Sequence, residues 1–454
     1  MDEKKDLFER MPVPKALASL AIPTIISQLI TMIYNLADAF FIGRTNDPYK
    51  VAAATLAFIL YFSMNGLSNL FGVGGGSLIS RLLGEDKPGE AKKVCSFSFY
   101  GTILVAGIYS LCALIFMEPL LRLLGASDNT IGYASAYTLW VVVIGGIPST
   151  LCMTVAHLLR SEGHARQASF GLGMGGVLNI ILDPLFMFVL LPAGQEVTGA
   201  AVATMLSNVI SLIYFLAVFV RLRNNSVLSL SPKYLLSGLR YAGTIFSVGF
   251  PAALSSLLAC LSNIVVNNLA AGYGDIPIAA IGISKKLEML PMNVGMGLCQ
   301  GMMPLVAYNY AARNYKRMKS AASCARISGI AFSLLCIVGV AIFAPSIMRL
   351  FIDDGETVAL GTDFLRICFL STPLMICNFQ MIHTLQAMGK GPQSLVLSSC
   401  RQGLIKIPLV FVMNRLVGLY GLLWTQLLSD SITLILAFII YHGVLRKLPA
   451  ENTL

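Results

Sequence analysis

The sequence predicts an all-α membrane protein with twelve transmembrane helices, arranged as two pseudo-symmetric six-helix lobes around a central cleft. Apolar residues make up 56% of the chain, charged residues only 12%, and the mean hydropathy is +0.76. A soluble domain carries about 25% charged residues. The apolar runs are about 20–30 residues long, which suits helices and not the alternating segments of about 10 residues in a β-barrel. In addition, the second half of the chain repeats the first.

Twelve apolar runs follow one another along the chain. Because a helix rises about 1.5 Å per residue, each run is long enough to cross a hydrocarbon layer of about 30 Å. Ten cysteines are scattered along the chain without any C-x-x-C pair, which indicates neither a disulfide framework nor a zinc site. The expected spans are residues 16–43, 51–83, 94–117, 131–158, 168–191, 198–220, 241–270, 278–310, 327–350, 362–386, 394–416 and 421–445.

The distribution of positive charge predicts the orientation. If the N-terminus is inside, 22 Lys and Arg residues fall in inner segments and five in outer segments or at their edges. Cytoplasmic loops are enriched in these residues, so we expect a multi-pass protein of the inner cell membrane with both termini in the cytoplasm. The net charge of +10 arises from these short loops. It therefore indicates contact with the lipid bilayer and not a nucleic-acid partner.

The internal repeat is visible in aligned stretches. "LASLAIPTIISQL" (17–29) matches "IFSVGFPAALSSL" (245–257), and "GAAVATMLSNVISLIY" (199–214) matches "GLLWTQLLSDSITLIL" (421–436). Six spans recur as six spans, which is an even number of crossings, so the halves have parallel topology about an axis along the membrane normal. We expect a monomer with an N-lobe (1–225) that holds spans 1–6 and a cation site, a cytoplasmic linker (226–240) and a C-lobe (241–454) that holds spans 7–12.

Asp38 is the only charged side chain in the first span. An ionisable group inside a membrane is energetically costly and is by default functional. Asn179 and Asp183 are four residues apart, which places them on one face of the fifth span, and Pro184 leaves a backbone carbonyl near that face without its hydrogen bond. With Thr204 of the sixth span, these oxygens suit a hard cation or a proton. No sequence rule says that the spans touch, and the alternative for both acids is a packing role.

The sequence also limits the class of function. It has no G-x-x-x-x-G-K-[ST] loop and no soluble domain large enough to hydrolyse a nucleotide, which disfavours a primary pump. Two six-span lobes with a cleft suit alternating access in an ion-coupled carrier. The rival class is a polytopic membrane enzyme. The four histidines show no H-x-x-x-H or H-E-x-x-H spacing, so we do not expect an enzyme.

Several motifs recur at the positions where one transporter family has them. They are "ADAFFIG" in span 1, "GVGGGSLISRLLGEDK" (72–87), "LNIILDPLF" (178–186), "GAAVAT" (199–204) and "MMPLVAYNYAARNYKR" (302–317). The chain resembles the bacterial branches of the multidrug and toxic compound extrusion (MATE) family over essentially its whole length. The resemblance implies a secondary antiporter that exports amphipathic or cationic organic compounds in exchange for Na⁺ or H⁺, with no other cofactor. The alternatives are a flippase for a lipid-linked precursor in the same superfamily and, less favoured, a membrane enzyme.

The resemblance also implies which residues form the site. In some family members the matching side chains of spans 1, 5 and 6 form a cation site in the N-lobe. For this sequence, the resemblance implies a site made of Asp38, Asn179, Asp183 and Thr204. These residues would bind a proton, or would be metal ligands if the coupling ion is Na⁺. The repeat aligns these four positions with residues that are not cation ligands of the same kind, namely Val266, Gly403, Ile407 and Gln426. The cation site is therefore expected in the N-lobe only.

The C-lobe carries a different set of polar residues, namely Lys285, Glu288, Arg401, Lys406 and Asp430. Because buried charges need partners, we expect them to form ion pairs between helices. The alternative places Glu288 in the cleft, where its carboxylate would attract a cationic substrate. Met292 and Met296 lie on the same span and would then supply an adaptable substrate lining. Otherwise they are ordinary core residues.

Overall fold

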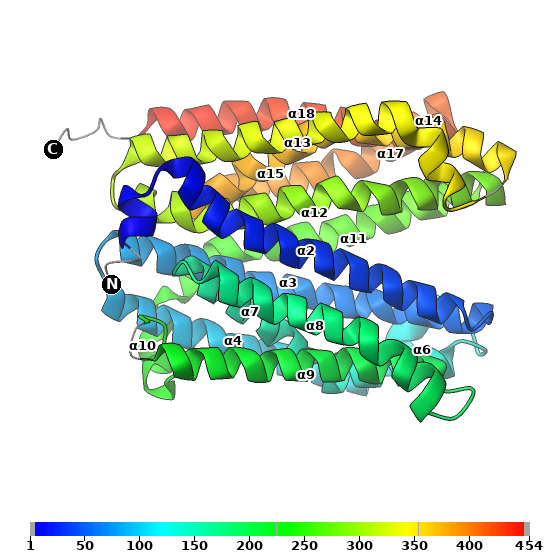
Figure 1. Cartoon of the computed structure of the whole chain (residues 1–454), viewed down its shortest axis with the longest axis horizontal. Coiled ribbons are helices and arrows are strands. Elements are labelled where there is room, and N and C mark those ends of the chain that lie inside the picture. The colour runs from blue at the N-terminus through cyan, green and yellow to red at the C-terminus, as the bar shows by residue number, and fades with distance from the viewer. Residues whose placement is uncertain (1–4, 224–225, 353, 449–454) are drawn as a thin grey trace.

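The computed structural model describes residues 5–223, 226–352 and 354–448, and within these residues every regular element is helical (Figure 1). The elements of the first half are η1 (Asp6–Arg10), α2 (Val13–Gly43), α3 (Pro48–Gly84), α4 (Pro88–Ile115), α5 (Met117–Leu123), α6 (Ile131–Thr138), η2 (Leu139–Ile144), α7 (Gly146–Ser161), α8 (Ala165–Leu185), η3 (Phe186–Leu190) and α9 (Glu196–Leu222). Those of the second half are η4 (Pro232–Tyr234), α10 (Leu235–Gly238), η5 (Leu239–Tyr241), α11 (Ala242–Ala271), α12 (Asp275–Ala311), α13 (Tyr315–Arg349), α14 (Gly355–Leu370), α15 (Thr372–Ala387), α16 (Gly391–Ser399), η6 (Cys400–Leu404), α17 (Lys406–Val417) and α18 (Leu419–Arg446).

Most of the twelve predicted spans are apolar and long enough to cross a membrane. Ten helical segments of the described residues meet this condition, and α6–η2 together with α7 make an eleventh, bent by 49°. Helix α12 occupies the place of the eighth predicted span and has 37 residues, but it carries Lys285, Lys286 and Glu288 and is not among these segments. The prediction of an all-helical membrane fold is confirmed, with α12 as a less apolar span.

The two halves form two bundles that lie side by side (Figure 1). Helices α2 and α3 of the first bundle pack on α12 and α11 of the second. A Cβ atom on Gly249 would stand 1.8 Å from the carbonyl oxygen of Leu70, and one on Gly301 would stand 2.5 Å from Cα of Ala21. Glycine is required at such positions because the helix backbones are in contact. At these two points the helix backbones of the lobes touch without a side chain between them.

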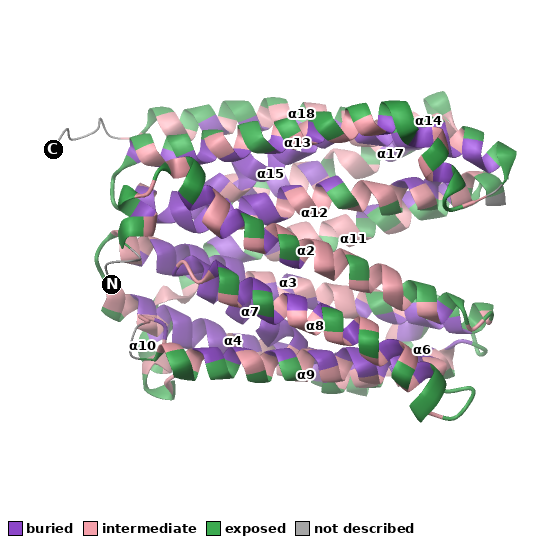
Figure 2. Cartoon of the chain, in the orientation of Figure 1, coloured by how far each residue is buried: buried purple, intermediate pink, exposed green. Residues whose placement is uncertain are grey.

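The lobes meet at the end of the molecule that holds both termini. Residues 71–80 of α3 and 375–382 of α15 are buried throughout, and Figure 2 shows buried residues gathered in this half. The Oγ of Ser77 donates to the Gln386 carbonyl at 2.6 Å, from one lobe to the other. We name this contact the seam. It comprises residues 21–25 of α2 and 70–84 of α3 against 245–249 of α11, 297–308 of α12 and 386–389 at the end of α15.

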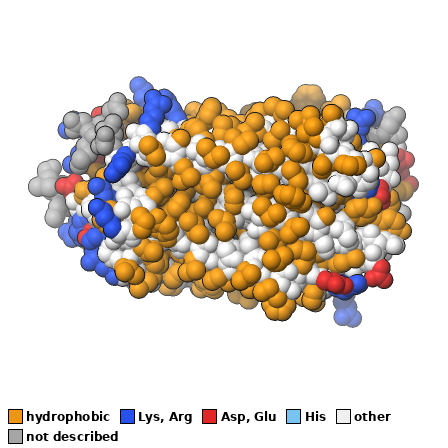
Figure 3. All heavy atoms as spheres, turned by 90° about the horizontal axis from the view of Figure 1, so that it is seen from below, with side chains coloured by type: hydrophobic (Ala, Val, Ile, Leu, Met, Phe, Trp, Pro, Cys, Tyr) orange, Lys and Arg blue, Asp and Glu red, His pale blue; other side chains and the backbone are white. Residues whose placement is uncertain are grey.

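The surface has the charge pattern of a membrane protein. On the face drawn in Figure 3, a broad band of hydrophobic side chains separates two charged ends. Lys and Arg gather at the end that holds the termini, and the acidic side chains visible on this face lie mostly at the other end. Large hydrophobic side chains on several helices are mostly exposed, such as Leu123 and Val220. An apolar band between polar rims is what a bilayer requires.

The segment expected as a linker between the lobes is partly helical and rests on the first bundle. It contains η4, α10 and η5. The Oγ of Ser96 in α4 donates to the Ser231 carbonyl at 2.9 Å, and the hydroxyl of Tyr100 donates to the Leu230 carbonyl at 2.9 Å. The carboxylate of Glu162 accepts from the backbone N–H of Val227 at 2.7 Å. The linker is therefore attached to the first lobe along much of its length.

Candidate ion-binding site

Three of the four predicted site residues are in direct contact inside the first lobe. The Nδ2 of Asn179 donates to Oδ1 of Asp183 at 3.0 Å and to Oγ1 of Thr204 at 3.1 Å. The exposed fractions of these side chains are 2% for Asn179, 0% for Asp183 and 6% for Thr204. The sequence placed Asn179 and Asp183 on one helix face, and the packing of α8 on α9 adds Thr204.

Local backbone features explain why α8 and α9 come so close at this point. Pro184 lies in the last turn of α8, and the chain continues as the π-helical turn η3. A Cβ atom on Gly199 of α9 would stand 2.8 Å from Cα of Met187 in η3. The small residue therefore allows the first turns of α9 to touch the end of α8. Thr204 lies five residues beyond this contact, at the level of Asn179.

Asp38 of α2 completes the group from a third helix. Its Oδ2 accepts from the hydroxyl of Tyr137 at 3.4 Å, and its carboxylate acts electrostatically on Asp183. Within the described residues it makes no direct hydrogen bond to Asn179, Asp183 or Thr204. The half-buried Asp38 and the buried Asp183 thus act on each other electrostatically without being joined by a hydrogen bond.

Each of three side chains leaves one oxygen without a donor. Oδ1 of Asp38, Oδ1 of Asn179 and Oδ2 of Asp183 are buried and have no hydrogen-bond partner among the described residues. Buried acceptors of this kind are rare in folded proteins because each costs free energy when it is left unpaired. A proton on one carboxylate would turn that oxygen into a hydrogen-bond donor for one of the others. A hard cation such as Na⁺ would suit the group because all of its ligand atoms are oxygens. This group of oxygen ligands is therefore chemically compatible with either Na⁺ or H⁺ as the coupling ion.

A small cavity adjoins this group on α8 and α9. Its volume is about 30 Å³, which is enough for a water molecule or a cation without its hydration shell. Sequence reasoning missed the tyrosines of the region. The position of Tyr34, four residues before Asp38 on α2, was a usable signal, whereas nothing in the sequence linked Tyr137 to Asp38. The cavity is lined by Thr31, Tyr34, Tyr61, Ser149, Cys152, Met153, Leu172, Gly175, Gly176, Asn179, Thr204, Ser207, Asn208 and Ser211.

The matching positions of the C-lobe are chemically different. Val266, which the repeat aligns with Asp38, is 5% exposed and lies in an apolar cluster. Gln426, aligned with Thr204, donates from Nε2 to Oδ2 of Asp430 at 2.6 Å. Oδ1 of the same carboxylate is 2.7 Å from Nε of Arg401. In the C-lobe the buried acid is thus paired with a guanidinium that belongs to the protein itself.

The other charged residues of the C-lobe follow the expected pairing only in part. Arg401 and Asp430 form the expected ion pair between helices, but Lys285 donates instead to Oδ1 of Asn267 at 3.2 Å. In the part of the chain that the structure describes, neither Lys285, Glu288 nor Lys406 has an oppositely charged partner within 4.0 Å. Glu288 is half-buried.

The two methionines considered for the substrate cleft are partly buried. Met292 and Met296 pack against a C-lobe cluster that contains Met375, Ile376 and Phe379. This contact is the one expected of ordinary core residues. It leaves part of each methionine side chain accessible, and they lie four and eight residues after Glu288 on α12.

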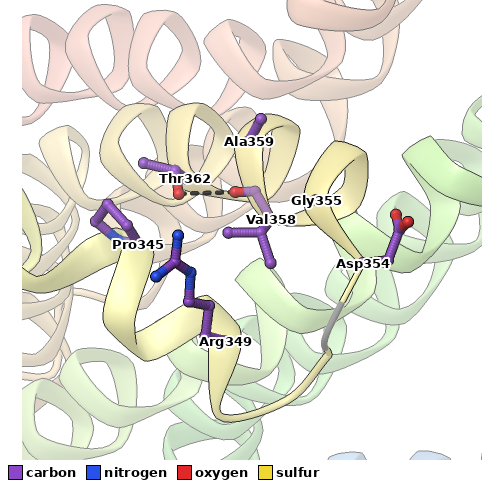
Figure 4. Close-up of a pocket in the computed structure, with 7 residues that line it drawn as sticks. All are labelled: Pro345, Arg349, Asp354, Gly355, Val358, Ala359 and Thr362. Carbon is purple, nitrogen blue, oxygen red and sulfur yellow. Dashed lines mark hydrogen bonds between the residues drawn. The ribbon is translucent and has the colours of Figure 1, made fainter.

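A larger cavity, of about 500 Å³, lies elsewhere on the C-lobe (Figure 4). It opens between the end of α13 and the start of α14. The guanidinium of Arg349 points between these helices, and the Asp354 side chain points away from it. None of the predicted site residues lines this cavity, whose walls are Pro345, Arg349, Asp354, Gly355, Val358, Ala359 and Thr362.

The duplicated architecture agrees with a known family. The MatE family model matches residues 23–185 and 251–412, one stretch in each lobe. The chain belongs to the MatE family. Relatives of this MatE protein include the Multidrug export protein MepA of Staphylococcus saprophyticus, which is 34% identical over 99% of this chain and 98% of its own length. The protein of the same name from Staphylococcus aureus strain MSSA476 is 34% identical over 100% of this chain and 98% of its own length.

Solved structures share the fold of the MatE protein. The outward-facing conformation of a multidrug resistance MATE family transporter of the MOP superfamily has a TM-score of 0.89 at 23% identity and covers 99% of both chains. A MOP superfamily transporter from Pyrococcus furiosus has a TM-score of 0.87 at 24% identity, again over 99% of both chains. The predicted two-lobe fold is confirmed. Family membership makes the MatE protein a multi-pass membrane transporter and not an enzyme, and the flippase alternative is not favoured.

Proposed function

We propose that this MatE protein exports amphipathic, cationic organic compounds in exchange for Na⁺ or H⁺. The observation that carries the proposal is the group of three unpaired oxygens on Asp38, Asn179 and Asp183, buried together in the N-lobe. The name of the relatives, Multidrug export protein MepA, supports the substrate class.

Coupling follows from the charge balance of the site. Two carboxylates in one desolvated region are both charged only when a cation lies between them. Without a cation, one of the two holds a proton. Binding of the coupling ion therefore removes repulsion between α2 and α8, and its release restores that repulsion. A ligand shifts a conformational equilibrium by its difference in affinity for the two states. Occupancy of this site would thus bias the lobe between the conformations that bind and release substrate.

We propose the lobe boundaries and orientation stated for the sequence. The N-lobe comprises residues 1–225, the linker 226–240 and the C-lobe 241–454, and the protein works as a monomer. Both termini lie in the cytoplasm, and the gathering of Lys and Arg at that end supports this orientation. The seam then closes the cytoplasmic side.

We also propose that Glu288 attracts the substrate. Its half-buried carboxylate has no cationic partner within 4.0 Å among the described residues. It lies on α12, which packs on α2 of the opposite lobe. The accessible parts of Met292 and Met296 would provide a deformable apolar surface next to this charge.

The test is transport in proteoliposomes loaded with a fluorescent organic cation such as ethidium. Efflux is measured under an imposed Na⁺ gradient, under an imposed pH gradient and without either. Asp38→Asn and Asp183→Asn should each reduce efflux to the rate seen without a gradient, and the double variant should add little because the two acids act as one unit. Val266→Thr, at the C-lobe position aligned with Asp38, is the matched control and should keep its gradient dependence. Normal gradient dependence in Asp38→Asn at normal protein level would refute the proposal.

A further inference from the structure

The N-terminal segment η1 lies across the seam. In Figure 1 it is the dark blue turn at the end of the molecule that holds both termini, beside α12. The segment η1 precedes the first helix of the N-lobe, yet its Phe8 side chain is only 1% exposed. A terminal segment is usually poorly ordered unless specific contacts hold it. Its contacts therefore need an explanation.

On the C-lobe side, η1 is bound by several directed contacts. The Phe8 ring stacks on the Tyr308 ring with centroids 4.8 Å apart, and the Tyr308 hydroxyl donates to Oε1 of Glu9 at 2.5 Å. The Nδ2 of Asn309 donates to the Phe8 carbonyl at 3.1 Å. The Nε of Arg317 donates to the same carbonyl at 2.6 Å, and its Nη2 donates to the Leu7 carbonyl at 3.2 Å. Hydrogen bonds from a guanidinium are stronger than those between neutral groups.

On the N-lobe side, η1 rests on the turn between α7 and α8. Gly163 in this turn has φ +96°, and a Cβ atom on it would stand 3.1 Å from Cδ2 of Leu7 and 3.4 Å from Cε2 of Phe8. Phe8 also shares an apolar cluster with Ala165, the first residue of α8. The Phe8 side chain thus touches both lobes, and Leu7 contacts the N-lobe through its side chain and the C-lobe through its backbone carbonyl.

We propose that η1 is a latch that holds the seam closed. Alternating access requires the lobes to separate at the seam, because that is where they touch. The turn that carries Gly163 then moves away from Tyr308, Asn309 and Arg317, and Phe8 cannot remain packed on both. The latch therefore stabilises the conformation that is closed at the terminal end and must release before the other conformation forms. The inference rests on the transport cycle proposed above.

The test is hydrogen–deuterium exchange of the full chain in lipid nanodiscs, without substrate or gradient. Phe8→Ala removes the stacked ring, and Arg317→Lys keeps the charge but loses the paired donors. Phe8→Ala should raise exchange in the seam peptides of α3 and α12 about tenfold, which is the order expected for loss of one stacked aromatic pair. Arg317→Lys should raise exchange in the same peptides, because hydrogen bonds from the guanidinium to the Leu7 and Phe8 carbonyls are lost. Exchange in α9, remote from the seam, should not change.

Two controls make the result specific. Phe411→Ala removes a ring that is 51% exposed on α17, away from η1, and should leave seam exchange unchanged. Unchanged seam exchange in both Phe8→Ala and Arg317→Lys would overturn the latch. An equal rise in α9 and at the seam would also overturn it, because η1 would then be a general stabilising element. Hydrogen–deuterium exchange needs no ion gradient, so its result is independent of the transport assay. The latch can be refuted while gradient-driven export is observed, and it can be supported while gradient-driven export is absent.

Discussion

Replacement of Arg401 by Met should destabilise the C-lobe strongly. The guanidinium is 4% exposed and its Nε lies 2.7 Å from Oδ1 of Asp430, which is 0% exposed. The guanidinium also lies over the Phe379 ring, 4.4 Å from its centroid. Removing one partner of a buried ion pair typically costs about 3–5 kcal/mol, because the other charge remains in a low-dielectric interior. Gln426 still donates to Asp430, so we expect a value near the lower limit, about 3 kcal/mol.

The assay is equilibrium unfolding in mixed detergent and dodecyl sulfate micelles. A loss of about 3 kcal/mol lowers the folding equilibrium constant about 150-fold. Arg401→Met combined with Asp430→Leu should recover most of the loss, because an apolar pair of similar volume can replace a buried ion pair at little cost. Arg415→Met, at an exposed position on α17, is the control and should change stability by less than about 0.5 kcal/mol. A double variant less stable than Arg401→Met alone would refute the reasoning.

Three further results are expected. Cysteines introduced in the loops at 84–93 and 311–320 should be unreactive toward an impermeant external reagent in intact cells, and labelling of either loop would overturn the proposed orientation. Glu288→Gln should reduce export of cations while sparing neutral compounds, and equal loss for both classes would assign Glu288 to packing. Gly249→Ala places a Cβ atom 1.8 Å from the Leu70 carbonyl and should cost about 1–3 kcal/mol by wedging the seam; a smaller loss in the unfolding assay would indicate that the seam is not tightly packed.

The sequence by itself determined the class of fold and its duplication. The apolar runs and the basic inner loops are properties of single segments, and the repeat is a comparison of one segment with another. None of these depends on which helices touch. The same holds for Asn179 and Asp183, since a spacing of four residues places two side chains on one face of any α-helix. The identity of α12 as a span also came from the sequence, although α12 is not among the helical segments that are long and apolar enough to be candidate spans.

Only the tertiary structure decided which side chains meet. Asp38 and Tyr137 are 99 residues apart in the chain, and a hydrogen bond over such a separation depends on helix packing that no local pattern encodes. The same limit applies to the C-lobe. The sequence predicted ion pairs between helices for the charged residues of this lobe, but Lys285 bonds to the neutral side chain of Asn267 on the neighbouring helix. The attachment of η1 to both lobes was likewise invisible, because its contacts join residues about 155 positions apart in the N-lobe and about 300 positions apart in the C-lobe.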